Sequence, residues 1–172
     1  IIIFMGSVIP LKKEIDNSYL RLKNLVGSKL DDVNQRIKYK LASEINLIHK
    51  MTDHHLNSGG KRIRPLLTLA SSRLCGYKNG DRDVNLAACI ELIHNATLLH
   101  DDVIDSSEIR RGAKTANSVW GNQSSILVGD YLFSRCFEMM VEDGSQEILK
   151  LLSSTSSRIA QGEVLQLEHR GE

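Results

Sequence analysis

The chain has 172 residues, of which 41% are hydrophobic and 25% carry a charge. These proportions are typical of one folded domain, and they exclude a disordered chain or a coiled rod. The 22 lysines and arginines nearly balance the 21 aspartates and glutamates, so the net charge is only +1. With no basic excess and few aromatic residues, we expect no nucleic-acid partner, and any anion site has to be built locally.

The cysteines and the first residues bear on where the protein works. Cys75, Cys89 and Cys136 are scattered, with no C-x-x-C pair, which favours reduced core thiols over a disulfide or zinc framework. The apolar run at residues 1–4 is far shorter than the roughly 20 residues that cross a membrane, and no basic segment precedes it. We therefore expect a cytoplasmic protein without a transmembrane segment.

Helical periodicity dominates the chain, and no stretch alternates strictly as a strand would. The pattern predicts six helices at residues 10–26, 30–53, 62–74, 84–106, 118–142 and 145–169. Gly59 and Gly60 lie in a turn, where glycine readily takes positive φ, and residues 107–117 form a charged loop. The prediction is a single all-α domain over residues 1–172, built as a helical bundle that is incomplete at its C-terminal end.

The sharpest motif is D-D-x-x-D at residues 101–105. Asp101 and Asp105 are four apart and share one helix face, where like charges cost about 0.2–0.5 kcal/mol per exposed pair. No basic residue stands at helical spacing to neutralise them. Carboxylates without a thiolate or a second imidazole suit Mg²⁺. The alternative is a solvated acidic helix end neutralised by distant lysines.

Basic residues occur at two places that fit an anion. In G-G-K-R-I-R-P, Lys61 and Arg64 stand at a predicted helix start, where backbone N–H groups and the helix dipole favour negative charge. Arg110 and Arg111 follow the acidic motif by five residues, in a loop that can fold back over it. Each has a plainer interpretation, as a solvated first turn or a surface arginine pair. Next to the carboxylates, we interpret them as phosphate ligands.

His94 lies seven residues before Asp101 on the same helix stripe. A single helical histidine is often a packing residue. Its alignment with the carboxylates makes a role in the site an equal alternative.

Five motifs in order resemble the trans-isoprenyl diphosphate synthases, and within that family the bacterial octaprenyl-type members. They are G-G-K-R-I-R-P, E-L-I-H-N-A-T-L-L-H-D-D-V-I-D, R-R-G, G-D-Y-L-F-S and G-E-V-L-Q-L. The resemblance implies an isoprenoid-synthase-type helical bundle. It also implies a Mg²⁺-dependent prenyltransferase that condenses isopentenyl diphosphate with an allylic prenyl diphosphate into a long chain, as for a quinone side chain. By resemblance, Lys61, Arg64, His94 and Arg111 hold isopentenyl diphosphate, and Arg110 holds the allylic diphosphate.

The same resemblance assigns Asp101 and Asp105 as Mg²⁺ ligands and Asp102 as the middle acidic position of the catalytic motif. A prenyl chain growing from this motif would run back along the helix past Ala96 and Thr97, about 7.5 Å away. Short-chain members carry a bulky aromatic near there, and this chain does not. We therefore expect a long product.

The second aspartate-rich motif of the family does not occur in this sequence, which resembles about the first half of such an enzyme. We expect the isolated chain to be inactive, and to need a homodimer or a partner that supplies the missing half. The alternative is a non-catalytic remnant or a subunit of a split synthase. A terpene cyclase shares the D-D-x-x-D but has no use for the Gly60-Lys61-x-x-Arg64 motif, and a phosphohydrolase needs a positioned base that we do not find.

Overall fold

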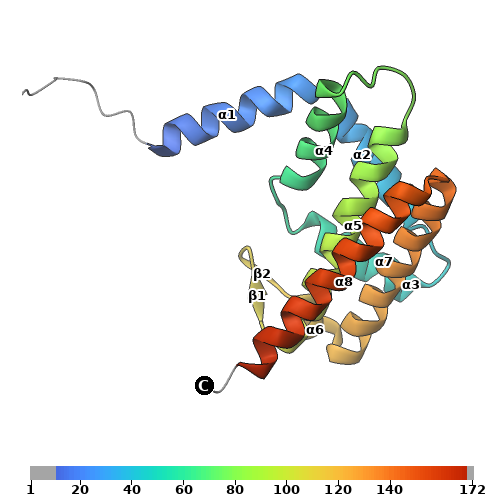
Figure 1. Ribbon diagram of the computed structural model, residues 1–172. Coiled ribbons are helices and arrows are strands. Elements are labelled where there is room, and N and C mark those ends of the chain that lie inside the picture. Colours follow the sequence, from blue (N-terminus) through green and yellow to red (C-terminus); the bar gives the residue numbers. More distant parts are fainter. Residues whose placement is uncertain (1–10, 170–172) are drawn as a thin grey trace, which may run out of the picture.

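Eight helices and one short hairpin make up residues 11–169, the range that the computed structural model describes (Figure 1). Pro10, the predicted start of the first helix, and the apolar run at residues 1–4 lie outside this range. The elements in chain order are α1 Leu11–Val26, α2 Lys29–Lys40, α3 Asn46–Asn57, α4 Ile63–Leu74, α5 Arg82–Ile104, β1 Ile109–Arg110, β2 Ala113–Lys114, α6 Ala116–Trp120, α7 Asn122–Asp143 and α8 Gln146–Glu168. The predicted all-α class is confirmed.

Helix α5 is the axis of the bundle, and it packs against α7, α4 and α2. Ala87 and Ala88 are fully buried, and their small side chains let the neighbouring helices approach closely. Leu92 and Leu99 are also fully buried, and burying each of these side chains contributes about 1.5–3 kcal/mol to the stability of the fold. The C-terminal turn of α5, which carries the acidic motif, is therefore held on a well-packed helix.

The predicted helix over residues 30–53 is wrong, because α2 ends at Lys40 and α3 begins at Asn46. Two side chains from α7 bind carbonyls at the end of α2. Arg135 donates to the Lys40 carbonyl at 2.5 Å, and the Tyr131 hydroxyl donates to the Ala42 carbonyl at 3.3 Å. These long-range bonds satisfy groups that a helix end leaves unpaired. No glycine or proline marks the break, so local pattern could not reveal it.

Two further sequence predictions need correction. The predicted helix over 118–142 is interrupted at Gly121, which has φ 84° and separates α6 from α7. Such a positive φ is readily available to glycine. Cys75, expected in the core, is exposed, whereas Cys89 and Cys136 are buried as expected.

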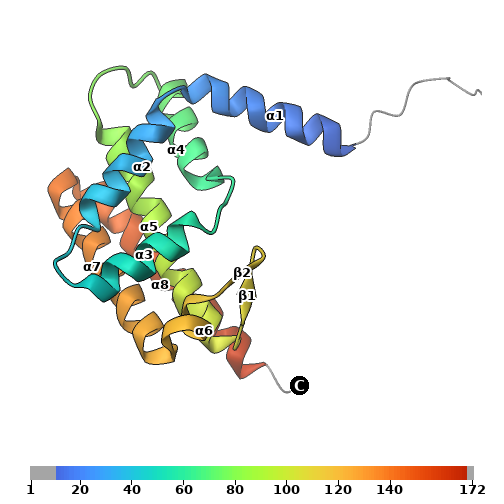
Figure 2. The same ribbon diagram turned by 180° about the vertical axis from the view of Figure 1, so that it is seen from behind.

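Helix α8 runs along one side of the bundle (Figures 1 and 2). None of its residues is buried, and Leu151 and Val164 are 64% and 65% exposed. Over the part of the chain that the structure describes, every helix is too short or too polar to cross a membrane. Large apolar side chains on α8 are therefore exposed on more than one face of the helix.

Candidate active site

A cavity of about 540 Å³ lies between α4, α5 and α8. Helix α4 contributes Arg64, and α5 contributes His94, Thr97 and Asp101 along one stripe. The facing wall comes from α8 and includes Glu163. A smaller cavity of about 180 Å³ shares part of these walls and extends toward α7. Charged groups of both signs therefore share a cavity whose walls also include apolar side chains such as Ile93, Leu98 and Ile159.

Asp101 is the acidic group of the cavity. Burial, together with the negative charges of Glu163 and Asp105, raises the pKa of its carboxyl group. Arg110 opposes this shift, but its effect is smaller than those three. Three acidic groups from two helices therefore act on one another at this end of the cavity, and a bound cation would relieve their repulsion.

These carboxylates fit a divalent cation as a partial donor set. Within residues 11–169, no group of three or more histidine, cysteine, aspartate or glutamate side chains is arranged to hold a metal alone. Mg²⁺ commonly takes only one or two carboxylates and completes its octahedron with waters and substrate phosphates. Asp101 and Asp105 are suited to that role, with the remaining ligands supplied by a bound diphosphate.

Asp102 is oriented differently from its neighbours in the motif. Its side chain is 1% exposed, and its Oδ1 accepts from Arg110 Nε at 2.9 Å and lies 2.8 Å from Arg110 Nη2. The other oxygen, Oδ2, is buried without a hydrogen-bond partner. Asn117 donates to the Asp102 carbonyl at 3.2 Å. Asp102 therefore anchors the β1–β2 hairpin, while the Arg110 side chain keeps 30% of its surface exposed.

Arg111 joins the hairpin to the glycine turn. It has φ 54°, and its guanidinium donates to the Gly59 carbonyl. A Cβ on Gly60 would lie 2.6 Å from Arg111 Nη1, so a side chain there would displace the arginine. Both glycines have positive φ, as predicted. Two motifs whose contacting residues are 52 positions apart in sequence thus meet at one place.

Four residues are expected to hold isopentenyl diphosphate. Arg111 lies against the glycine turn, and the other three are only partly brought together. Arg64 and His94 line the same cavity. Burial and the nearby Arg64 guanidinium lower the pKa of His94, so its ring is neutral at neutral pH. Lys61 lies outside the cavity lining, with its Nζ 5.8 Å from the centroid of the Tyr19 ring.

Sequence reasoning missed two polar residues around this site and left a third unassigned. Glu91, nearly fully buried, pairs with Arg62 at 2.6 Å and so fixes the start of α4 on α5. His55, on α3, is buried close enough to Asp102 and Arg110 for their charges to act on it. Glu163 belongs to the G-E-V-L-Q-L motif, but only the placement of α8 across the cavity from α5 reveals that it faces Asp101.

The two residues expected to line the chain-length pocket differ in position. Thr97 lines both the larger and the smaller cavity. Ala96 is fully buried in the core and lies in the wall of neither. Adjacent helical positions point about 100° apart, which explains why only one of the pair faces the cavity.

The family of the chain follows from comparison with known proteins. Residues 45–172 match the model of the Polyprenyl synthetase family, and the chain belongs to that family. Its relatives include the octaprenyl diphosphate synthase of Escherichia coli (strain K12), 44% identical over 147 residues, which are 86% of this chain and 45% of that protein. The chain thus spans about half the length of the curated relatives it matches.

Solved structures agree with this assignment. A decaprenyl diphosphate synthase from Rhodobacter capsulatus superposes with a TM-score of 0.84 at 48% identity, over 87% of this chain and 46% of that one. A polyprenyl synthase from Caulobacter crescentus CB15, complexed with calcium and isoprenyl diphosphate, gives 0.83 at 46%, over 87% and 45%. The expected isoprenoid-synthase-type bundle is confirmed.

Proposed function

We propose that this chain is the diphosphate-binding part of a trans-polyprenyl diphosphate synthase, which condenses isopentenyl diphosphate with an allylic prenyl diphosphate. The observation that supports this most is a single cavity with Asp101 at one end and Arg64 with His94 on its wall. Anionic and cationic groups are separated there by apolar surface, as a substrate with a charged head and a hydrocarbon tail requires.

The allylic diphosphate is assigned to the carboxylate end. Asp101 and Asp105 would hold Mg²⁺, which when bound supplies positive charge to the departing diphosphate. Arg110, held in place by Asp102, presents the exposed part of its guanidinium from the hairpin, and Arg111 stands beside it in the chain. A preplaced arginine stabilises developing negative charge without having to reorganise.

Isopentenyl diphosphate is assigned to Arg64, His94, Lys61 and Arg111. The neutral His94 ring can donate one hydrogen bond to a phosphate oxygen, while Arg64 supplies the charge. Lys61 has to swing from the Tyr19 ring to reach the same anion, which its flexible stem allows. In the reaction, the allylic C–O bond breaks, the isopentenyl double bond forms the new C–C bond, and a proton leaves the resulting cation.

We assign a long product of the octaprenyl type to this site. The support is Thr97, a small residue at the junction of the two cavities, where an aromatic side chain would close the passage. Ala96 cannot limit the length of the product in this way, because it packs in the core.

We further propose that exposed apolar side chains of α8 are covered by another part of the synthase, either a second copy of the chain or a partner polypeptide. They include Leu151 and Val164, each about two-thirds exposed. Exposed apolar surface of this kind is typical of protein–protein contact.

A fusion enzyme tests the proposed reaction. Residues 45–172 replace the matching segment of the Escherichia coli octaprenyl diphosphate synthase, and incorporation of radiolabelled isopentenyl diphosphate is measured. We expect labelled prenyl product with the fusion and at least a roughly hundredfold lower rate with Asp101→Asn, the scale of losing one electrostatic stabiliser. A matched Glu147→Gln change, at an exposed carboxylate outside the lining of both cavities, should leave the rate within about twofold. A folded fusion without incorporation would contradict the proposal.

A further inference from the structure

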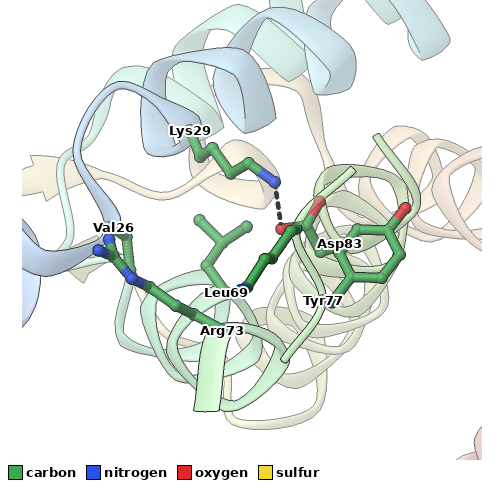
Figure 3. Close-up of a pocket in the computed structure, with 7 residues that line it drawn as sticks. Val26, Lys29, Leu69, Arg73, Tyr77 and Asp83 are labelled. Carbon is green, nitrogen blue, oxygen red and sulfur yellow. Dashed lines mark hydrogen bonds and ion pairs between the residues drawn. The ribbon is translucent and has the colours of Figure 1, made fainter. Parts of the chain in front are cut away.

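A second cavity, of about 470 Å³, lies near the other end of α5 (Figure 3). It forms where the turn between α1 and α2 meets the end of α4 and the loop before α5. Its lining residues are Val26, Lys29, Leu69, Arg73, Tyr77, Lys78 and Asp83. Asp83 precedes Asp101 by 18 positions on α5, which is about 27 Å at 1.5 Å per residue. This cavity is therefore separate from the proposed catalytic site.

The charge of this second cavity is predominantly positive, with three cationic side chains and one carboxylate. The carboxylate is already engaged, because Asp83 Oδ2 pairs with Lys29 Nζ at 2.6 Å and Oδ1 accepts from the Val84 N–H at 3.0 Å. Arg73 and Lys78 therefore have no lining acid left to neutralise them. An anion entering the cavity would meet two uncompensated cations.

The two remaining cations are available for a ligand. The Arg73 guanidinium donates one N–H to the Leu25 carbonyl, which fixes its direction and leaves other N–H groups for an acceptor. Lys78 Nζ makes no hydrogen bond or ion pair within residues 11–169. The first turn of α5, which begins at Arg82, adds the positive end of a long helix nearby. These features together favour a phosphate group.

The floor of the cavity is apolar and aromatic. Val26 and Leu69 are 8% and 2% exposed. Figure 3 shows Arg73 and Tyr77 on opposite sides of Leu69, with Lys29 reaching toward Asp83 above it. The Tyr77 ring is held from two directions, because Lys29 Nζ lies 5.7 Å from its centroid and its hydroxyl accepts from the Arg82 N–H at 3.3 Å. A ligand here would place a hydrocarbon or ring against this floor.

We propose that this cavity is a second ligand site, which binds a small organic phosphate with an apolar body. The phosphate lies between Arg73 and Lys78, and the body rests on Val26, Leu69 and Tyr77. The volume of about 470 Å³ is within the range of small-molecule sites, about 300–1,000 Å³. The site needs no metal and does not depend on the proposed catalytic role of the other cavity.

Amide chemical shifts of the ¹⁵N-labelled chain, recorded without Mg²⁺, test the proposal. The probes are a ten-carbon prenyl monophosphate and inorganic phosphate. We expect the prenyl monophosphate to shift amides at residues 76–80 in a saturable way, and to bind there at least about tenfold more tightly than inorganic phosphate because of the apolar floor. Shifts confined to residues 59–64 and 94–101 would overturn the proposal, and so would equal affinity for the two probes.

Matched variants locate the anion. Arg73→Gln with Lys78→Gln should weaken prenyl monophosphate binding at residues 76–80 by at least about tenfold, since charge-assisted hydrogen bonds are lost. Lys78→Gln alone, at an exposed side chain, provides the same test if the double variant does not fold. Lys150→Gln removes an exposed lysine of α8 outside the cavity and should change nothing. Unchanged binding in the Arg73 and Lys78 variants would overturn the proposal.

Discussion

Acidification should destabilise the protein through one buried histidine, His55. This side chain is 7% exposed, and the charges of Asp102, Arg110 and Arg111 act on it. Burial is the largest influence on it and, with the charges of Arg110 and Arg111, it lowers the pKa of His55 from 6.5 to about 4, against the opposing effect of Asp102. The ring is therefore neutral in the folded protein throughout the range in which an unfolded chain would protonate it.

The direction and size of the effect follow from linkage. Because the folded pKa lies below the unfolded value, the unfolded state binds more protons, so the stability present above pH 6.5 is lost as pH falls toward 4. Between pH 7 and pH 5 the loss from this one ring is about 2 kcal/mol, at 1.36 kcal/mol per pKa unit. Most carboxyl groups titrate near pH 4, so they contribute little to the change between pH 7 and pH 5.

Urea denaturation followed by circular dichroism at pH 7 and pH 5 measures this loss. In His55→Gln, which does not titrate, the pH-dependent loss should shrink by about 2 kcal/mol, whatever the variant's stability at pH 7. His49→Gln removes an exposed histidine and should keep the full loss. If the parent and His55→Gln lose the same free energy between the two pH values, the reasoning about burial is refuted. Should the variant not fold, NMR titration of the His55 ring gives the pKa directly.

Three other predictions concern separate contacts. Arg110→Ala should lower the free energy of unfolding by about 3–5 kcal/mol in urea, because it leaves a buried carboxylate unpaired; a loss below 1 kcal/mol would contradict the anchoring role. Gly129→Ala should cost about 1–3 kcal/mol in the same assay, since the new Cβ would lie 2.3 Å from His100 Nε2; a gain in stability would show that the ring moves freely. In the fusion enzyme, Thr97→Phe should shorten the labelled products on reversed-phase chromatography, whereas Ala96→Phe should destabilise the core. Products of unchanged length with Thr97→Phe would contradict the proposal that the growing prenyl chain passes Thr97.

Local pattern was enough to predict the elements whose ends are marked by local chemistry. The helix now seen as α4 follows the turn at Gly59 and Gly60, and α5 carries an apolar belt long enough to show its period. The break between α2 and α3 was missed because its cause is tertiary. Tyr131 and Arg135, which are 89 and 95 positions along the chain from their partners, bind the carbonyls at the end of α2.

The site shows the same division between local and long-range information. Helical spacing was sufficient to place Asp101 and His94 on one stripe of α5, but the sequence analysis did not separate Thr97, which lines the cavity, from Ala96, which does not. Spacing could not show that Asp102 turns toward the hairpin, or that Glu163 on α8 faces Asp101, because both depend on how distant segments pack. The position of Lys61 against Tyr19 was also beyond reach, since α1 is brought there by the packing of whole helices.

If the carboxylates at the C-terminal end of α5 bind a diphosphate through a divalent cation, the affinity of the chain for diphosphate has to depend on Mg²⁺. Calorimetric titration with inorganic diphosphate, with and without Mg²⁺, measures this dependence. We expect Mg²⁺ to raise the affinity at least about tenfold, about 1.4 kcal/mol, and Asp101→Asn with Asp105→Asn to abolish this gain. Equal affinity with and without Mg²⁺, or an undiminished gain in the double variant, would contradict binding through a divalent cation.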